Sequence, residues 1–80
     1  MEYLKTYQSK YLAMLNSLYK VEKDDFAKFE LIEDCHSLLM ELNQLEIDSQ
    51  IDKRKIKKKD LAAAIKDARD IDRFYNEYIN

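Results

Sequence analysis

The 80-residue sequence contains no glycine, no proline and no tryptophan. Tight turns between strands depend chiefly on glycine, which accepts positive φ, and on proline, whose φ is preset. The absence of both argues against β structure and predicts long helices with short connections. We therefore expect an all-α fold in a single domain over residues 1–80.

Residues that carry chemistry are also scarce. Cys35 is the sole cysteine and His36 the sole histidine, so neither an internal disulfide nor a His-based metal cage is available. Glu33 and His36 have the Glu-x-x-His spacing of di-iron bundles, but those sites need a second such motif. Cys35 and His36 point about 100° apart on a helix, which prevents a nucleophile–base contact. Without glycine there is no phosphate-binding loop. We expect no enzyme activity, no metal and no cofactor.

The chain has no apolar run near the roughly 20 residues that a membrane span requires. Its first residues also lack the basic-then-apolar pattern of a signal peptide. We therefore expect a cytoplasmic protein with no membrane partner. Abundant Lys, Ile, Tyr and Asn with few Arg is typical of AT-rich coding, as in a low-GC bacterium or its phage.

Apolar residues recur at alternating spacings of three and four, which is the heptad pattern of packed helices. In the first predicted helix, residues 2–23, they are Leu4, Tyr7, Tyr11, Met14, Leu18 and Val21. In the second, residues 25–47, the apolar face is Phe29, Leu31, Ile32, Cys35, Leu38, Leu39, Leu42 and Leu45. In the third, residues 52–79, they are Leu61, Ala64, Ala68, Ile71, Tyr75 and Tyr78. Short connections then predict a three-helix antiparallel bundle.

The first connection is expected near residues 23–25, with Asp24 or Asp25 as N-cap of the second helix. Continuing the first heptad stripe would place Asp25 and Lys28 in the core, which favours a turn. The alternative is one continuous helix that replaces helices one and two and forms a long hairpin dimer. The second connection is expected around residues 47–52, with Ser49 or Asp52 as N-cap, although the third helix could instead begin at Asp60. Wide apolar stripes in so short a chain also favour a homodimer.

Charge is distributed unevenly along the sequence. Residues 1–23 carry four bases and two acids, a net of +2. Residues 24–52 carry nine acids and one base, a net of −8, and residues 53–80 carry nine bases and five acids, a net of +4. These sum to the net charge of −2 for the whole chain.

The candidate partner-binding residues are a basic run and two tyrosines outside the heptad stripe. They are Lys53, Arg54, Lys55, Lys57, Lys58, Lys59, Tyr3 and Tyr19. Tyrosine is enriched at interfaces, and basic residues in the first turn oppose the helix dipole, which suggests a functional demand. The pattern favours a protein partner with an acidic surface. Nucleic acid is the alternative, but the pI near 5.4 gives little long-range attraction to phosphate.

Residues 68–78, ARDIDRFYNEY, resemble the second helix of the small sporulation-control aspartyl-phosphate phosphatases. The signature of that family is Ser-x-x-x-Asp followed by an apolar pair and a tyrosine. The resemblance implies a helical hairpin that acts on a phosphorylated response regulator, with Asp72 in the place of the functional aspartate. The signature serine is replaced by Ala68, and the first 30 residues have no counterpart.

These observations predict a small helical regulator that binds a larger protein and inhibits or redirects it. Such a role suits phage host-takeover or anti-defence proteins and bacterial regulators. An aspartyl-phosphate phosphatase and a nucleic-acid-binding protein that uses residues 53–59 are the alternatives.

Overall fold

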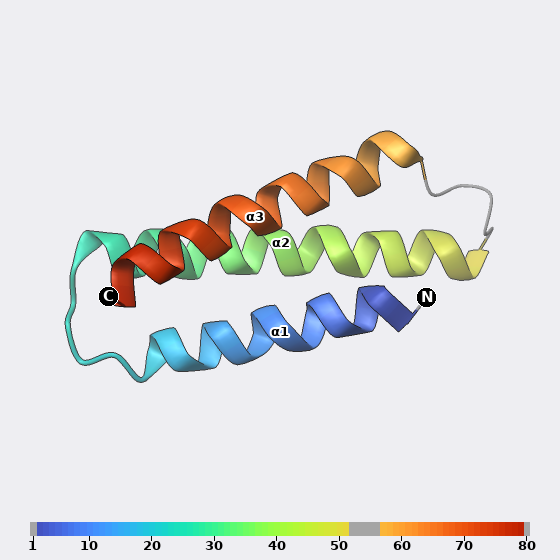
Figure 1. Cartoon of the computed structure of the whole chain (residues 1–80). Helices are drawn as coiled ribbons and strands as arrows, with labels where there is room; N and C mark the ends of the chain where they lie inside the picture. Colours follow the sequence, from blue (N-terminus) through green and yellow to red (C-terminus); the bar gives the residue numbers. More distant parts are fainter. Residues whose placement is uncertain (1, 52–56, 80) are drawn as a thin grey trace.

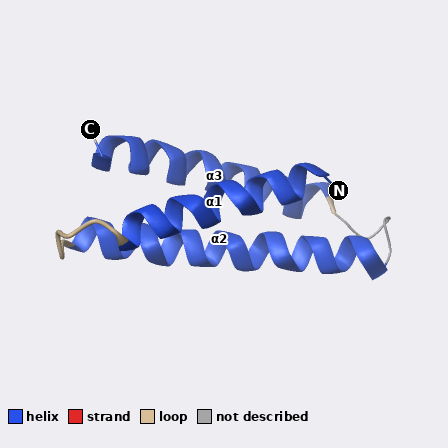
Figure 2. Cartoon of the chain, turned by 90° about the horizontal axis from the view of Figure 1, so that it is seen from below, coloured by secondary structure: helices blue, strands red, loops and turns tan. Residues whose placement is uncertain are grey.

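The computed structural model of the chain describes residues 2–51 and 57–79, which contain three helices and no strand. They are α1 (Glu2–Tyr19), α2 (Phe26–Ile51) and α3 (Lys58–Ile79). Successive helices run antiparallel, and α2 lies between α1 and α3 in Figure 1. The view turned by 90° shows α1 and α3 on the same side of α2 (Figure 2). The all-α prediction and the three-helix prediction are confirmed.

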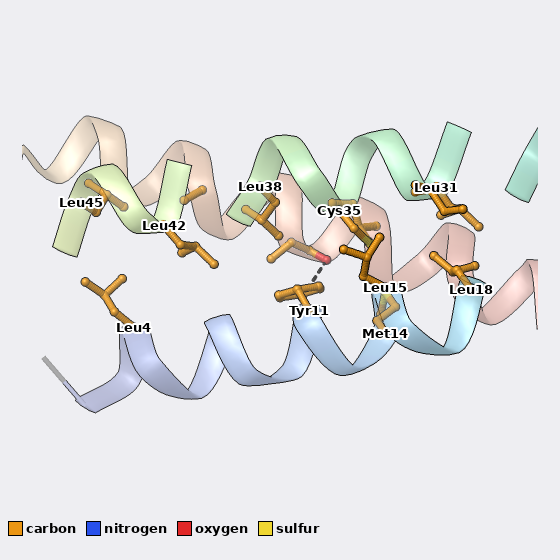
Figure 3. Packing of buried hydrophobic residues seen from close by; sticks show 14 residues of the cluster. Leu4, Tyr11, Met14, Leu15, Leu18, Leu31, Cys35, Leu38, Leu42 and Leu45 are labelled. Carbon is orange, nitrogen blue, oxygen red and sulfur yellow. Dashed lines mark hydrogen bonds between the residues drawn. The ribbon is translucent and has the colours of Figure 1, made fainter. Parts of the chain in front are cut away.

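Side chains from all three helices form a single apolar core, and its α1 and α2 members point toward one another in Figure 3. The buried members are Leu4, Tyr11, Met14, Leu15, Leu18, Leu31, Ile32, Cys35, Leu38, Leu42, Leu45, Ala64, Ala68 and Ile71. All of them belong to the predicted apolar faces, where Leu15 widens the stripe of the first helix. Phe29 was expected in the core and is 53% exposed, because it lies on the outward face of α2.

The contact between α3 and the rest of the core depends on small residues. Ala64 and Ala68 are almost fully buried, whereas Ala62 and Ala63 are exposed. Only the first pair therefore lets α3 approach α2 closely. Within the described residues, no helix is long and apolar enough to cross a membrane.

The predicted break between the first two helices is present at residues 20–25. Asp25 Oδ1 accepts a hydrogen bond from the backbone N–H of Lys28 at 2.8 Å, so Asp25 is the N-cap of α2. The buried Lys28 ammonium donates to the carbonyl of Val21 at 3.0 Å and pairs with Asp24 at 3.2 Å. The polar residues that interrupt the heptad stripe therefore build the turn, and helices one and two are separate.

Three predicted helix boundaries were wrong. The helix α1 ends at Tyr19 and not at residue 23, because Lys20 and Val21 donate to carbonyls three residues back, which tightens and ends the last turn. The helix α2 continues to Ile51 beyond residue 47, and the Ser49 hydroxyl donates to the Glu46 carbonyl inside it. Ser49 is therefore no N-cap.

The described part of α3 begins at Lys58 and not at residue 52. The backbone N–H groups of Asp60 and Leu61 donate to the Lys57 carbonyl. Asp60 accordingly lies within the first turn and does not precede the helix. The other N-cap candidate, Asp52, lies outside the described residues.

Candidate functional site

The structure places the predicted partner-binding residues in different parts of the molecule. Lys57, Lys58 and Lys59 are exposed at the start of α3, which lies at the same end of the molecule as the N-terminal end of α1 (Figure 1). Tyr19 lies at the opposite end of α1, so the structure does not bring it together with these lysines. The other predicted partner-binding groups lie outside the described residues: Lys53, Arg54, Lys55 and the side chain of Tyr3.

Tyr19 is instead part of the outer edge of the α1–α2 contact. Its hydroxyl lies 3.0 Å from Nε2 of His36, and the two rings meet edge to face. Tyr19 is 58% exposed, and His36 is exposed as well. The contact holds both rings at the surface, where they remain available to a partner.

Asp72, the aspartate of the phosphatase resemblance, is engaged by α1. Its Oδ1 accepts from the Tyr11 hydroxyl at 2.9 Å, and its Oδ2 pairs with the Lys10 ammonium at 2.9 Å. The Tyr11 hydroxyl also lies 3.2 Å from the carbonyl of Ala68, the bond dashed in Figure 3. The carboxylate therefore joins α1 to α3 across the core in the folded chain.

Cys35 is fully buried among apolar side chains. Burial raises the pKa of its thiol to about 11, helped by the charges of Asp34 and Asp72. A thiolate is the reactive form of cysteine, and this environment disfavours it. Cys35 is thus a small core residue, as its place in the apolar stripe predicts.

A shallow groove runs between α2 and α3. It consists of three hollows of about 290, 280 and 300 Å³. The first two share Asp34 and Phe74, and the second and third share Glu41. Along α2 the groove extends from Ala27 to Asp48, roughly 30 Å at the rise of an α-helix. We call this surface the acidic groove.

Eight carboxylates line the acidic groove. They are Glu30, Asp34, Glu41 and Asp48 on α2, and Asp60, Asp67, Asp70 and Glu77 on α3. Among the described residues that line it there is no Lys, Arg or His. Phe74, which is 46% exposed, and Tyr78 supply apolar surface at one end. The groove is therefore negative with an aromatic end, although Arg73, which is not among its lining residues, pairs with Asp70 at 3.7 Å.

Burial and neighbouring charges act together on two of these carboxylates. The pKa of Asp34 is raised by partial burial and by the charges of Glu30, Glu33 and Asp67. The pKa of Glu41 is raised by partial burial and by the charge and hydrogen bond of Asp67. Like charges held close together disfavour ionisation, so a positive charge placed between α2 and α3 would relieve a repulsion that the free protein carries.

The carboxylates are spread along the groove instead of converging on one point. In the described part of the chain, no group of three or more His, Cys, Asp or Glu side chains is placed to hold a metal ion. An extended cationic ligand therefore matches the arrangement better than a single ion does.

The sequence contains the signal for this groove, although the partner-binding prediction did not use it. The acids of α2 recur at residues 30, 34, 41 and 48, and those of α3 at residues 60, 67, 70 and 77. Spacings of three, four and seven place residues on one helical face. The net charge of residues 24–52 does not show which face of the helix the acids occupy.

No protein family, no curated protein and no solved structure matches the chain. The resemblance to the sporulation-control phosphatases therefore rests on residues 68–78 alone and stays a prediction.

Proposed function

We propose that this protein is a small helical regulator that binds a basic, helical segment of a larger protein in its acidic groove. The single observation that carries this proposal is a groove lined by eight carboxylates and no described base. Interfaces use complementary potentials to select and orient partners. Here this protein supplies the acidic surface and its partner supplies the basic one. The sequence predicts the opposite arrangement, in which the basic run of this chain meets an acidic surface of the partner. Lys57, Lys58 and Lys59 remain a candidate for such a second contact.

The shape of the groove supports a helical ligand. Two antiparallel helices border a straight hollow of roughly 30 Å, the length of about 20 helical residues. A partner helix with one apolar stripe and Lys or Arg at its flanks would place the stripe on Phe74, Leu38 and Leu45, which line the floor. Its bases would then lie beside carboxylates of both α2 and α3. This is the helix-in-groove mode of recognition.

Occupying a basic helix is itself a regulatory act. Basic segments commonly bind nucleic acid or acidic protein surfaces, and a protein that covers such a segment blocks those contacts. Inhibition by masking needs no catalytic group on the regulator. The same chemistry suits a phage or bacterial regulator acting in the cytoplasm, the compartment that we expect.

A designed peptide tests the proposal directly. The probe is an amphipathic helix of about 20 residues containing only Leu and Lys, compared with a Leu/Glu helix of identical spacing. Calorimetry should detect binding of the Leu/Lys peptide and no binding of the Leu/Glu peptide. The affinity should fall as salt rises from about 50 to 300 mM, because salt screens exposed charges. Equal affinity for both peptides would overturn the charge argument.

Matched variants locate the binding site. Asp34→Asn combined with Glu41→Gln should weaken binding of the Leu/Lys peptide at least about tenfold. Glu22→Gln combined with Glu46→Gln removes the same charge outside the groove and should leave affinity within about twofold of wild type, after allowance for screening. If both double variants bind equally weakly, the attraction reflects net charge and the groove is not the site.

A further inference from the structure

We infer that the outward face of α2 is a homodimer interface, on which a second copy of this chain packs with its own α2 antiparallel. The face consists of two exposed heptad rows. One row is Phe26, Glu33, Met40 and Ile47, and the other is Phe29, His36, Asn43 and Gln50. We call these eight residues the outer stripe. The first row and Phe29 lie away from the core and from the acidic groove, whereas the second row borders α1, since His36 contacts Tyr19 and Asn43 Oδ1 accepts from Gln8.

The outer stripe has the spacing that elsewhere in this chain marks a buried face, and four of its eight residues, Phe26, Phe29, Met40 and Ile47, are large and apolar. Rows at spacings of three and four are the seam of helix pairs, and the other such seams in the chain are packed in the core. The helix α2 therefore carries apolar residues on an outer face as well as on its inner face. An exposed apolar patch of this kind marks an interaction site.

The exposed apolar area is large enough for a stable dimer. Five large apolar side chains of α2 are exposed here: Phe26, Phe29, Met40, Ile47 and Ile51. Each is between 49% and 80% exposed. With about 150–250 Å² for a large aromatic side chain, they present on the order of 600 Å². Stable interfaces bury about 600–1,000 Å² per partner.

The outer stripe matches itself in the antiparallel direction. A twofold axis passing near residue 38 would place Phe29 opposite Ile47 of the second copy and Met40 opposite His36 of the second copy. Glu33 would then face Asn43 of the second copy, whose amide can donate to the carboxylate. A parallel pair would instead place Glu33 against Glu33, a like-charge contact that costs stability. Twofold dimers require a patch that complements itself, and the antiparallel register provides one.

The first test is the mass of the intact protein in solution. Sedimentation equilibrium at about 100 μM, a concentration that would saturate a dimer with a Kd of about 1 μM, should give twice the chain mass of 9.6 kDa. Met40→Glu combined with Ile47→Glu should weaken the dimer more than about tenfold. Both residues are exposed in the single chain, so circular dichroism should show unchanged helicity. A wild-type protein that remains monomeric would overturn the inference.

A matched control separates this interface from other apolar surface. Phe74→Glu and Ile79→Glu introduce the same charge at exposed residues of α3 and should leave the dimer intact. The Met40/Ile47 variant should still bind the Leu/Lys peptide, because the acidic groove is on another face. If the wild-type protein dimerises but does not bind the peptide, the proposed function fails and the dimer inference stands. If it binds the peptide but remains monomeric, the dimer inference fails and the proposed function stands.

Disulfide cross-linking tests the direction of packing. Chains with Phe29→Cys and chains with Ile47→Cys are purified separately, mixed and oxidised with copper phenanthroline. The mixture should form a covalent dimer, whereas each variant alone should not, since identical positions near opposite ends would be separated by about 27 Å. Native Cys35 is fully buried and should not compete. Cross-linking of each variant alone would indicate parallel packing and contradict the proposed register.

Discussion

The hydroxyl of Tyr11 donates to Oδ1 of Asp72 at 2.9 Å from within the apolar core. Tyr11 is fully buried, while Asp72 remains partly exposed and also pairs with Lys10. The bond fixes α3 against α1, two helices that meet through long side chains and not through close backbone approach. It also gives Asp72 a structural role that is independent of any phosphatase chemistry.

We expect Tyr11→Phe to destabilise the protein by about 1–2 kcal/mol, because a hydrogen bond to a charged acceptor is lost while the ring still packs. In thermal unfolding the midpoint should fall by at least about 4 °C. Lys10→Ala is the matched comparison, since it removes a partly exposed ion pair worth about 0–1 kcal/mol. A larger loss from Lys10→Ala than from Tyr11→Phe would show that the ion pair dominates.

Alkaline pH should destabilise the fold in two separable steps. Burial is the main cause that raises the pKa of Cys35 from 9.0 to about 11 and the pKa of Tyr11 above its usual 10.0. The unfolded chain then releases these protons at lower pH than the folded one, so stability is complete below pH 9 and falls as pH rises. Cys35→Ala should remove the loss of stability between pH 9 and 10. Tyr11→Phe should reduce the loss of stability above pH 10. Urea midpoints across this range measure both.

The N-cap of α2 joins that helix to the end of α3. Asp25 Oδ1 accepts from the Lys28 N–H, and its Oδ2 accepts from the Tyr78 hydroxyl at 3.4 Å. Asp25→Ala should cost about 1–2 kcal/mol in urea unfolding, the usual range for loss of a capping side chain. Asp25→Asn keeps an acceptor and should recover most of the loss. If Asn is as damaging as Ala, the charge matters more than the cap.

The helices and most of the core were predictable because heptad spacing reports which residues share a face. The boundaries were not, since they depend on contacts between segments. Lys28 in α2 binds the Val21 carbonyl and thereby fixes the first connection, and no local pattern indicates that bond. Phe29 was assigned to the core because α2 has apolar residues on two faces, and spacing alone does not say which face meets α1 and α3.

The candidate site was harder to predict for a related reason. Charge summed over a segment ignores direction, whereas the acidic groove arises because α2 and α3 turn their acids toward the same hollow. Asp34 and Asp67 are 33 positions apart in sequence, yet Asp67 contributes to the raised pKa of Asp34. Asp67 lies close enough to influence Asp34 because Ala68 and Ile71 pack in the core, and this packing sets the rotation of α3.

Removing one acid from the groove should stabilise the free protein. Partial burial is the main cause that raises the pKa of Asp34 and of Glu41, and Asp67→Asn removes a charge that contributes to both shifts. Their raised pKa values mean that stability is present at acid pH and is lost as pH rises above about 4. The variant should therefore gain about 0.5 kcal/mol at pH 7, or 2–4 °C in melting temperature, with no gain at pH 3. Glu77→Gln, an equal charge change farther along the groove, should gain less.

The small side chain of Ala68 should be essential for packing α3. Ala68 is 5% exposed, and its carbonyl lies 3.2 Å from the Tyr11 hydroxyl, so a larger side chain would push α3 away from α1 and break the bond between Tyr11 and Asp72. We expect Ala68→Leu to cost about 1–3 kcal/mol through overpacking. Ala62→Leu makes the same change on the exposed face and should alter stability by less than about 0.5 kcal/mol. Equal melting temperatures for the two variants would contradict this packing of α3. They would mean that residue 68 is no more buried than residue 62, and therefore that α3 is rotated differently about its axis.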